Sequence, residues 1–94
     1  MIHLHIEHGV GNYDAWKAAF DSDPAGRQKS GVRRYRILRP VDNPSTVIID
    51  LEFDRLDQAE ALLAAMQQVW KGIGGMFVNP PQWQIAEIME TREY

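Results

Sequence analysis

Four stretches of the chain alternate between apolar and polar residues, the pattern of a β-strand with one buried face. The alternation is strict over residues 2–7, where Ile2, Leu4 and Ile6 share one side, and over residues 46–53. Residues 32–39 and 82–90 carry weaker versions of the same pattern. A turn rich in proline, asparagine and aspartate over residues 40–45 separates the second and third stretches, which predicts a hairpin.

Two further stretches have helical spacing instead. Asn12 is suited to cap a short helix whose aromatic residues Tyr13, Trp16 and Phe20 share one face. This helix is expected to break near Ser22, and a short helix or turn then runs to Gly31, which suits a left-handed conformation.

The second helix is longer and strongly amphipathic. Asp54 is expected to cap it, with Asp57 in the position of a capping-box partner. Its apolar residues fall within an arc of about 140°; they are Leu56, Ala59, Leu62, Leu63, Met66, Val69, Trp70 and Ile73. The glycines Gly72, Gly74 and Gly75 are expected to end it.

The element order β-α-β-β-α-β predicts an α+β ferredoxin-like plait. Right-handed crossovers in both β-α-β halves give an antiparallel sheet in the strand order 4-1-3-2, with both helices on one face. A chain of 94 residues provides one core, so residues 1–94 are expected to form a single domain.

Composition excludes several classes of protein. Ten Lys and Arg against thirteen Asp and Glu give a net charge of -3, which argues against a nucleic-acid-binding protein. No apolar run approaches the roughly 20 residues of a membrane span, and the N-terminus lacks the pattern of a signal peptide. With no cysteine, disulfides and thiolate chemistry are excluded, and the cytoplasm is the expected location.

The predicted sheet leaves one face without helices. The residues expected there are polar and of both charges: His3, His5 and Glu7 on the first strand, Arg34 and Arg36 on the second, Asp50 and Glu52 on the third. Such a face is either solvated, with cross-strand ion pairs, or packed against a second copy of the chain. Covering the face would help a domain with so small a core, which favours a homodimer interface.

Three segments carry a resemblance to a known family. Residues 13–20 (YDAWKAAF), 31–39 (GVRRYRILR) and 47–54 (VIIDLEFD) together resemble the dimeric α+β barrel superfamily, which contains the antibiotic-biosynthesis-monooxygenase-like proteins. The resemblance implies a homodimer with sheets packed face to face, forming a dimeric α+β barrel. It also implies a small-molecule pocket between each sheet and its own helices. The superfamily includes cofactor-free oxygenases, haem-degrading enzymes, isomerases and members without known activity, so the fold by itself assigns no reaction.

The expected pocket is apolar. Trp16, Tyr35, Phe53, Met66 and Trp70 would wall it and could bind a flat aromatic ligand, although the same side chains could simply fill the core. Tyr35 is the candidate proton donor. No catalytic residue beyond it is assigned.

The chain departs from the oxygenases of the superfamily. These are typified by an asparagine on the first strand, where this chain has apolar residues facing the helices. No histidine lies on the second helix to serve as an axial haem ligand, so no cofactor is expected.

A metal site is the remaining alternative. His3, His5 and Glu7 share one side of a strand, and imidazole with carboxylate is a legitimate set of ligands for a divalent ion. Polar pairing across the sheet explains the same residues, and His8 points to the other side, so no metal is expected. Imidazoles among carboxylates would also make a dimer interface sensitive to pH.

Two functions follow from these observations. The first is a small-molecule-binding homodimer, similar to cofactor-free monooxygenases and acting on an aromatic or polyketide-like compound. The second is a non-catalytic structural or regulatory homodimer with a fully packed core. No nucleic acid or membrane is expected as a partner.

Overall fold

The fold is an antiparallel four-stranded sheet with two helices on one side. The computed structural model covers the whole chain and describes all of it except residues 73–79. The strands are β1 (Ile2–Gly9), β2 (Val32–Leu38), β3 (Thr46–Phe53) and β4 (Gln82–Glu87), and the helices are α1 (Tyr13–Asp21) and α2 (Leu56–Gly72). The sheet order β2-β3-β1-β4 is the predicted order read from the opposite edge, so the ferredoxin-like topology is confirmed.

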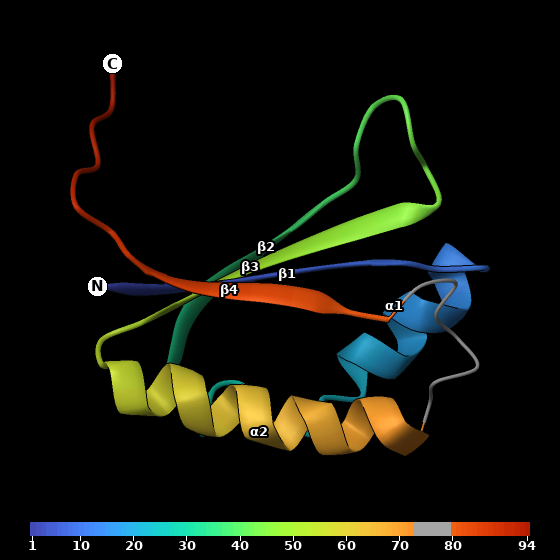
Figure 1. The fold of residues 1–94 in the computed structure, drawn as a ribbon, viewed down its shortest axis with the longest axis horizontal. Helices are drawn as coiled ribbons and strands as arrows, with labels where there is room; N and C mark the ends of the chain where they lie inside the picture. The colour runs from blue at the N-terminus through green and yellow to red at the C-terminus, as the bar shows by residue number, and fades with distance from the viewer. Residues whose placement is uncertain (73–79) are drawn as a thin grey trace.

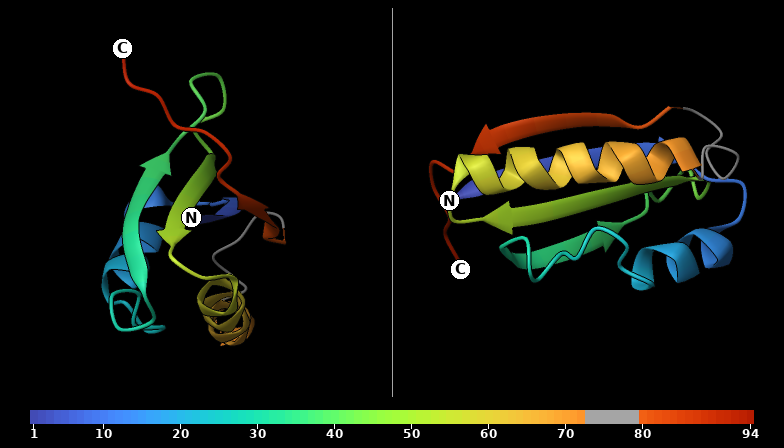
Figure 2. Two further views of the ribbon diagram at one scale, coloured as in Figure 1. Left: turned by 90° about the vertical axis from the view of Figure 1, so that its left-hand side faces the viewer. Right: turned by 90° about the horizontal axis from the view of Figure 1, so that it is seen from below.

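Both helices cover the same face of the sheet. They lie on one side of the strands in Figure 1, and the view from below in Figure 2 shows α2 running along β1 between β4 and β3. The core comes from the two central strands and the facing sides of the helices, because the register places Leu4 opposite Leu51 and Ile6 opposite Ile49. Trp16 and Phe20 of α1 and Leu62 and Met66 of α2 complete this core.

The first helix begins and ends as predicted. The side chain of Asn12 accepts a hydrogen bond from the amide of Ala15 at 3.0 Å, and Ser22 closes the helix. The chain then continues as turns up to Gly31, whose φ of 100° confirms the expected left-handed conformation. A side chain at Gly31 would also collide with that of Gln58.

The cap of the second helix was predicted one residue too early. The helix begins at Leu56, so Arg55 occupies the capping position, and its amide donates to Oε1 of Gln58 at 3.0 Å. Gln58 is therefore the residue that reaches back to the cap, because it lies three positions beyond it and its side chain is long enough. Asp57 instead accepts from the Nε of Arg55 at 2.9 Å. Ile73, Gly74 and Gly75 lie outside the described residues.

Three strand ends differ from the expected ones. β1 continues to Gly9, because His8 and Gly9 still pair with Val47 and Thr46 of β3. β2 ends at Leu38 and β4 ends at Glu87, both earlier than expected. The register of β4 places Trp83 beside Ile6 and Ile85 beside Leu4, which puts both side chains on the helix side.

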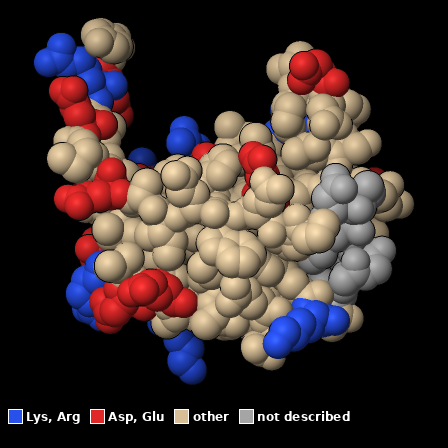
Figure 3. All heavy atoms as spheres, in the orientation of Figure 1, with Lys and Arg blue, Asp and Glu red and all other residues tan. Residues whose placement is uncertain are grey.

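The helix-free face lies between two projecting segments. The turn of residues 39–45 and the segment of residues 88–94 both rise on the side of the sheet away from the helices (Figure 1). In the space-filling view of Figure 3 they form two prominences with a depression between them. No helix among the described residues is long and apolar enough to cross a membrane.

Candidate functional site

A cavity lies between the two helices and the sheet. It has a volume of about 50 Å³. Residues of α1, the turns that follow it, α2 and the two central strands line it: His8, Trp16, Ala19, Phe20, Pro24, Ala25, Arg27, Ile49, Met66, Val69 and Trp70. Nine of these eleven residues are apolar, and His8 and Arg27 supply the polar side chains.

Aromatic rings form one wall of the cavity. Trp16 and Phe20, one turn apart on α1, stack with their ring centroids 5.2 Å apart. The imidazole of His8 meets the edge of Trp16 at 5.6 Å. These packed rings make the wall apolar and aromatic, which is typical of sites that bind planar ligands.

His8 carries an ionisable group to the helix side of the sheet. It continues the series Ile2, Leu4 and Ile6 along β1, and its side chain is buried. Burial lowers the pKa of His8 below its ordinary value of 6.5, while a hydrogen bond with the backbone of Gly9 acts in the opposite direction. The imidazole is therefore neutral at neutral pH and able to accept a proton from an acidic ligand.

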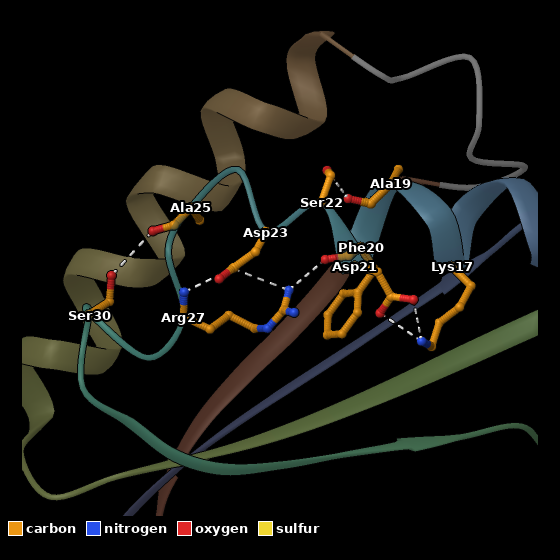
Figure 4. Close-up of polar contacts among 9 residues, drawn as sticks. All are labelled: Lys17, Ala19, Phe20, Asp21, Ser22, Asp23, Ala25, Arg27 and Ser30. Atoms are coloured by element: carbon orange, nitrogen blue, oxygen red, sulfur yellow. Dashed lines mark hydrogen bonds and ion pairs between the residues drawn. The ribbon is translucent and has the colours of Figure 1, made fainter.

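Arg27 places a positive charge at the cavity. Its guanidinium lies 3.8 Å from the ring centroid of Phe20 and donates to the carbonyl oxygen of the same residue at 2.7 Å. Figure 4 shows how Asp23 fixes Arg27, because one carboxylate oxygen accepts from its amide at 2.9 Å and lies 3.4 Å from its Nη1. Asp23 adopts a positive φ of 53°, a strained conformation that this contact helps to hold.

The structure brings together three of the five residues expected in the pocket. Trp16, Met66 and Trp70 line the cavity. Phe53 does not: it is fully buried in the core. Tyr35, the expected proton donor, contacts the edge of Phe20 at 5.2 Å and lines an open groove beside β2 with Arg27 instead.

The two polar residues that line the cavity, His8 and Arg27, were not among those expected from the sequence. The position of His8 could have been predicted from the sequence. If the alternation of β1 is extended beyond Glu7, His8 lies on the same side of the strand as Ile6. No sequence pattern predicts the position of Arg27, because it lies in a turn and turns have no regular periodicity.

The residues expected at a dimer interface lie together on the helix-free face. His5 lies opposite Asp50, and His3 and Arg34 both lie opposite Glu52. The Nε of Arg34 is 2.6 Å from a carboxylate oxygen of Glu52. These pairs confirm the predicted cross-strand arrangement of charges.

Asp50 joins the two histidines of this face. One oxygen of Asp50 lies 2.9 Å from Nε2 of His3 and 2.8 Å from Nδ1 of His5. Glu7 lies 3.3 Å from the other ring nitrogen of His5. Partial burial acts to lower the pKa of His5, but the hydrogen bonds to Asp50 and Glu7 outweigh it and raise that pKa.

Solved structures share this architecture over nearly their whole length. A proposed antibiotic biosynthesis monooxygenase from Deinococcus radiodurans aligns with a TM-score of 0.75 and 17% identity, covering 100% of this chain and 98% of that one. The chain has the fold of these monooxygenase-like proteins. The resemblance inferred from the sequence is thereby confirmed at the level of the fold.

Two further structures have the same fold. A variant of SnoaB, a cofactor-independent oxygenase from Streptomyces nogalater, aligns with a TM-score of 0.72 and 13% identity over 96% of this chain and 94% of that one. A protein of unknown function from Nitrosomonas europaea aligns with a TM-score of 0.70 and 18% identity over 99% and 93% of the two chains. No protein-family model and no curated protein sequence matches this chain.

Proposed function

We propose that this protein binds a flat aromatic or polyketide-like compound in the cavity between its helices and its sheet. The observation that carries the proposal is the composition of that cavity: a stacked aromatic wall with one imidazole and one guanidinium among apolar side chains. Such a site favours a planar ring system that bears an acidic hydroxyl group. The ring would lie against Trp16, and the hydroxyl would face His8 or Arg27.

The chemistry of the two polar groups supports more than binding. A neutral His8 can take the proton of an acidic hydroxyl, and the guanidinium of Arg27 can stabilise the anion that results. Loss of that proton makes an aromatic compound easier to oxidise. The fold shared with SnoaB, described as a cofactor-independent oxygenase, supports oxygenation of the bound compound as the activity to test.

Ligand binding requires the cavity to widen. Its volume of about 50 Å³ is smaller than the roughly 150 Å³ of a cavity that accommodates benzene. Val69 and Trp70 lie near the end of α2 and are only partly buried, so a shift of this end of the helix would widen the cavity.

Filling the cavity tests this proposal. Ala19 lines the cavity, whereas its neighbour Ala18 is exposed on the same helix. We expect Ala19→Phe to weaken binding of a hydroxynaphthoquinone at least tenfold, measured by quenching of tryptophan fluorescence, and Ala18→Phe to leave it unchanged. Because a quinone is already oxidised, oxygen uptake would then be measured with a naphthol, whose ring is at a lower oxidation level. Absence of saturable binding, or equal affinity in the two variants, would contradict the proposal.

The helix-free face is proposed as the interface of a homodimer. Its support is the mixed-charge surface of β1, β2 and β3, which is complementary to a copy of itself, and the two segments that project around it. A structural homodimer without a ligand is the second candidate function. The small volume of the cavity favours it. Equal ligand affinity of the Ala19→Phe and Ala18→Phe variants, together with a dimeric mass in solution, would support it.

A further inference from the structure

Two histidines and one aspartate converge on the helix-free face. His3 and His5 are two residues apart on β1, so their side chains share a side, and Asp50 of β3 lies opposite His5. One ligand atom from each residue lies within 4.8 Å of the other two. The three come from the two central strands, which hold their backbones in a fixed register.

Hydrogen bonding explains only part of this arrangement. Nδ1 of His5 forms a hydrogen bond with Oδ1 of Asp50 at 2.8 Å. Nε2 of His3 lies 2.9 Å from the same oxygen, yet it is buried and makes no hydrogen bond of acceptable geometry with any described residue. Its contact with Asp50 therefore lacks the alignment of the hydrogen bond that a buried polar atom normally makes.

We propose that His3, His5 and Asp50 bind a divalent transition-metal ion, with Zn²⁺ as the ion of best fit. Zn²⁺ is bound at about 2.0–2.2 Å by imidazole nitrogen and carboxylate oxygen, so in a tetrahedral site its ligand atoms lie about 3.3–3.6 Å apart. The spacings of 2.8 and 2.9 Å between imidazole and carboxylate are those of hydrogen-bonded pairs, so each pair would open by about 0.5 Å to hold the ion. Two imidazoles with one carboxylate favour zinc and other first-row transition metals over Ca²⁺ and Mg²⁺, which prefer oxygen ligands.

Glu7 contacts a ligand of the site without binding the ion itself. Its carboxylate lies 3.3 Å from Nε2 of His5, the ring nitrogen that points away from Asp50. When Nδ1 of His5 binds the ion, the ring proton is on Nε2, and this N–H donates a hydrogen bond to the carboxylate of Glu7. This carboxylate–histidine–metal arrangement orients the ring and strengthens its nitrogen as a ligand.

The surroundings permit a cation to enter. His3 and Asp50 line a groove of about 290 Å³ on this face, so a cation can approach the site in a single chain. Arg34 is paired with Glu52. Arg36 lies opposite Asp50 and its charge opposes the ion, but its side chain is exposed and screened by water. The site faces away from the cavity, so the inference does not rest on ligand binding there. It lies on the face proposed as the dimer interface, so in a dimer the bound ion would be enclosed between the two sheets.

Zinc titration of the untagged protein tests the site. Calorimetry with ZnCl₂ is expected to give one ion per chain. His3→Gln, His5→Gln and Asp50→Asn are each expected to weaken binding by more than tenfold. Glu7→Gln should weaken it by about tenfold. Asp42→Asn, which removes an exposed carboxylate in the turn between β2 and β3, is the matched control and should bind as the wild type does.

A second measurement uses the wild-type chain alone. Nitrogen NMR of the imidazole rings is expected to show shifts of His3 and His5 on addition of zinc, while His8, on the other side of the sheet, stays unchanged. Failure of the wild type to take up zinc would overturn the inference. So would unaltered affinity in folded His5→Gln and Asp50→Asn, or a zinc-induced shift of His8 in place of His3 and His5.

Discussion

His8 brings a titratable ring into the apolar layer between the sheet and the helices. The same position would suit an aliphatic residue, because Ile6 and Val47 beside it are fully buried. An imidazole at this position makes the free energy of folding depend on pH. Burial removes water from the ring, which disfavours its charged form, so protonation at low pH destabilises the folded state. The residue can therefore be examined by its effect on stability, independently of any reaction.

Acidification is expected to destabilise the protein through His8. Because burial lowers the pKa of His8 below 6.5, the unfolded chain binds a proton at a higher pH than the folded chain does. The contribution of His8 to the free energy of unfolding is therefore fully present above 6.5 and is lost as the pH falls toward the pKa of the folded state. His8→Gln should flatten this part of the pH dependence in urea denaturation at pH values on both sides of 6.5.

The difference between wild type and variant isolates His8, since the other two histidines are present in both chains. An equal loss of stability on acidification in the two proteins would contradict the prediction.

The elements show where periodicity is informative. The strict alternation of residues 46–53 predicts both bounds of β3, because each inward side chain is buried by the helices. The cap of α2 could not be read as reliably, since Asp54, Arg55 and Asp57 all stand near its start and only the path of the backbone selects one of them. The turns after α1 follow no period, which is why the role of Arg27 was not predicted.

The buried side of α2 can be tested with two leucines. Leu62 is 1% exposed and Leu56 is 50% exposed, although both belong to the apolar arc predicted from the sequence. We expect Leu62→Ala to reduce the free energy of unfolding by about 2–5 kcal/mol, because it leaves a cavity in the core. Leu56→Ala should cost less than about 1 kcal/mol.

Chemical denaturation of the two variants measures both values. Similar losses would mean that Leu56 is covered in the native protein, by another part of the chain or by another molecule.

At the scale of the whole molecule, the sheet order and the placement of both helices follow from the element order and the handedness of the crossovers. The residues of the candidate site are less well predicted by the sequence. Trp16, Met66 and Trp70 share the helix side, as their spacing predicts, but which of the inward side chains border a cavity depends on how they pack. Tyr35 shows this: it is on the helix side of β2, yet β2 is an edge strand and the residue is 42% exposed.

Self-association is expected through the helix-free face. Leu38 is 40% exposed and lies opposite Ile48 there, which gives this charged surface an apolar patch. Sedimentation should give twice the chain mass of 10.8 kDa, and Leu38→Glu should weaken the dimer at least tenfold by burying a charge at the interface. Leu56→Glu, a similarly exposed leucine on the helix side, is the matched control.

A wild-type mass of one chain would contradict the dimer, and equal weakening by both glutamate variants would contradict this interface.

The path of residues 88–91 has a practical consequence for the choice of expression tag. Ile88 donates its amide to the carbonyl of Met1, and Ile88 and Thr91 border the same groove as His3. A hexahistidine sequence fused before Met1 would begin close to this groove. It could mimic metal uptake or obstruct pairing of two chains, so purification should rely on a cleavable fusion without histidines.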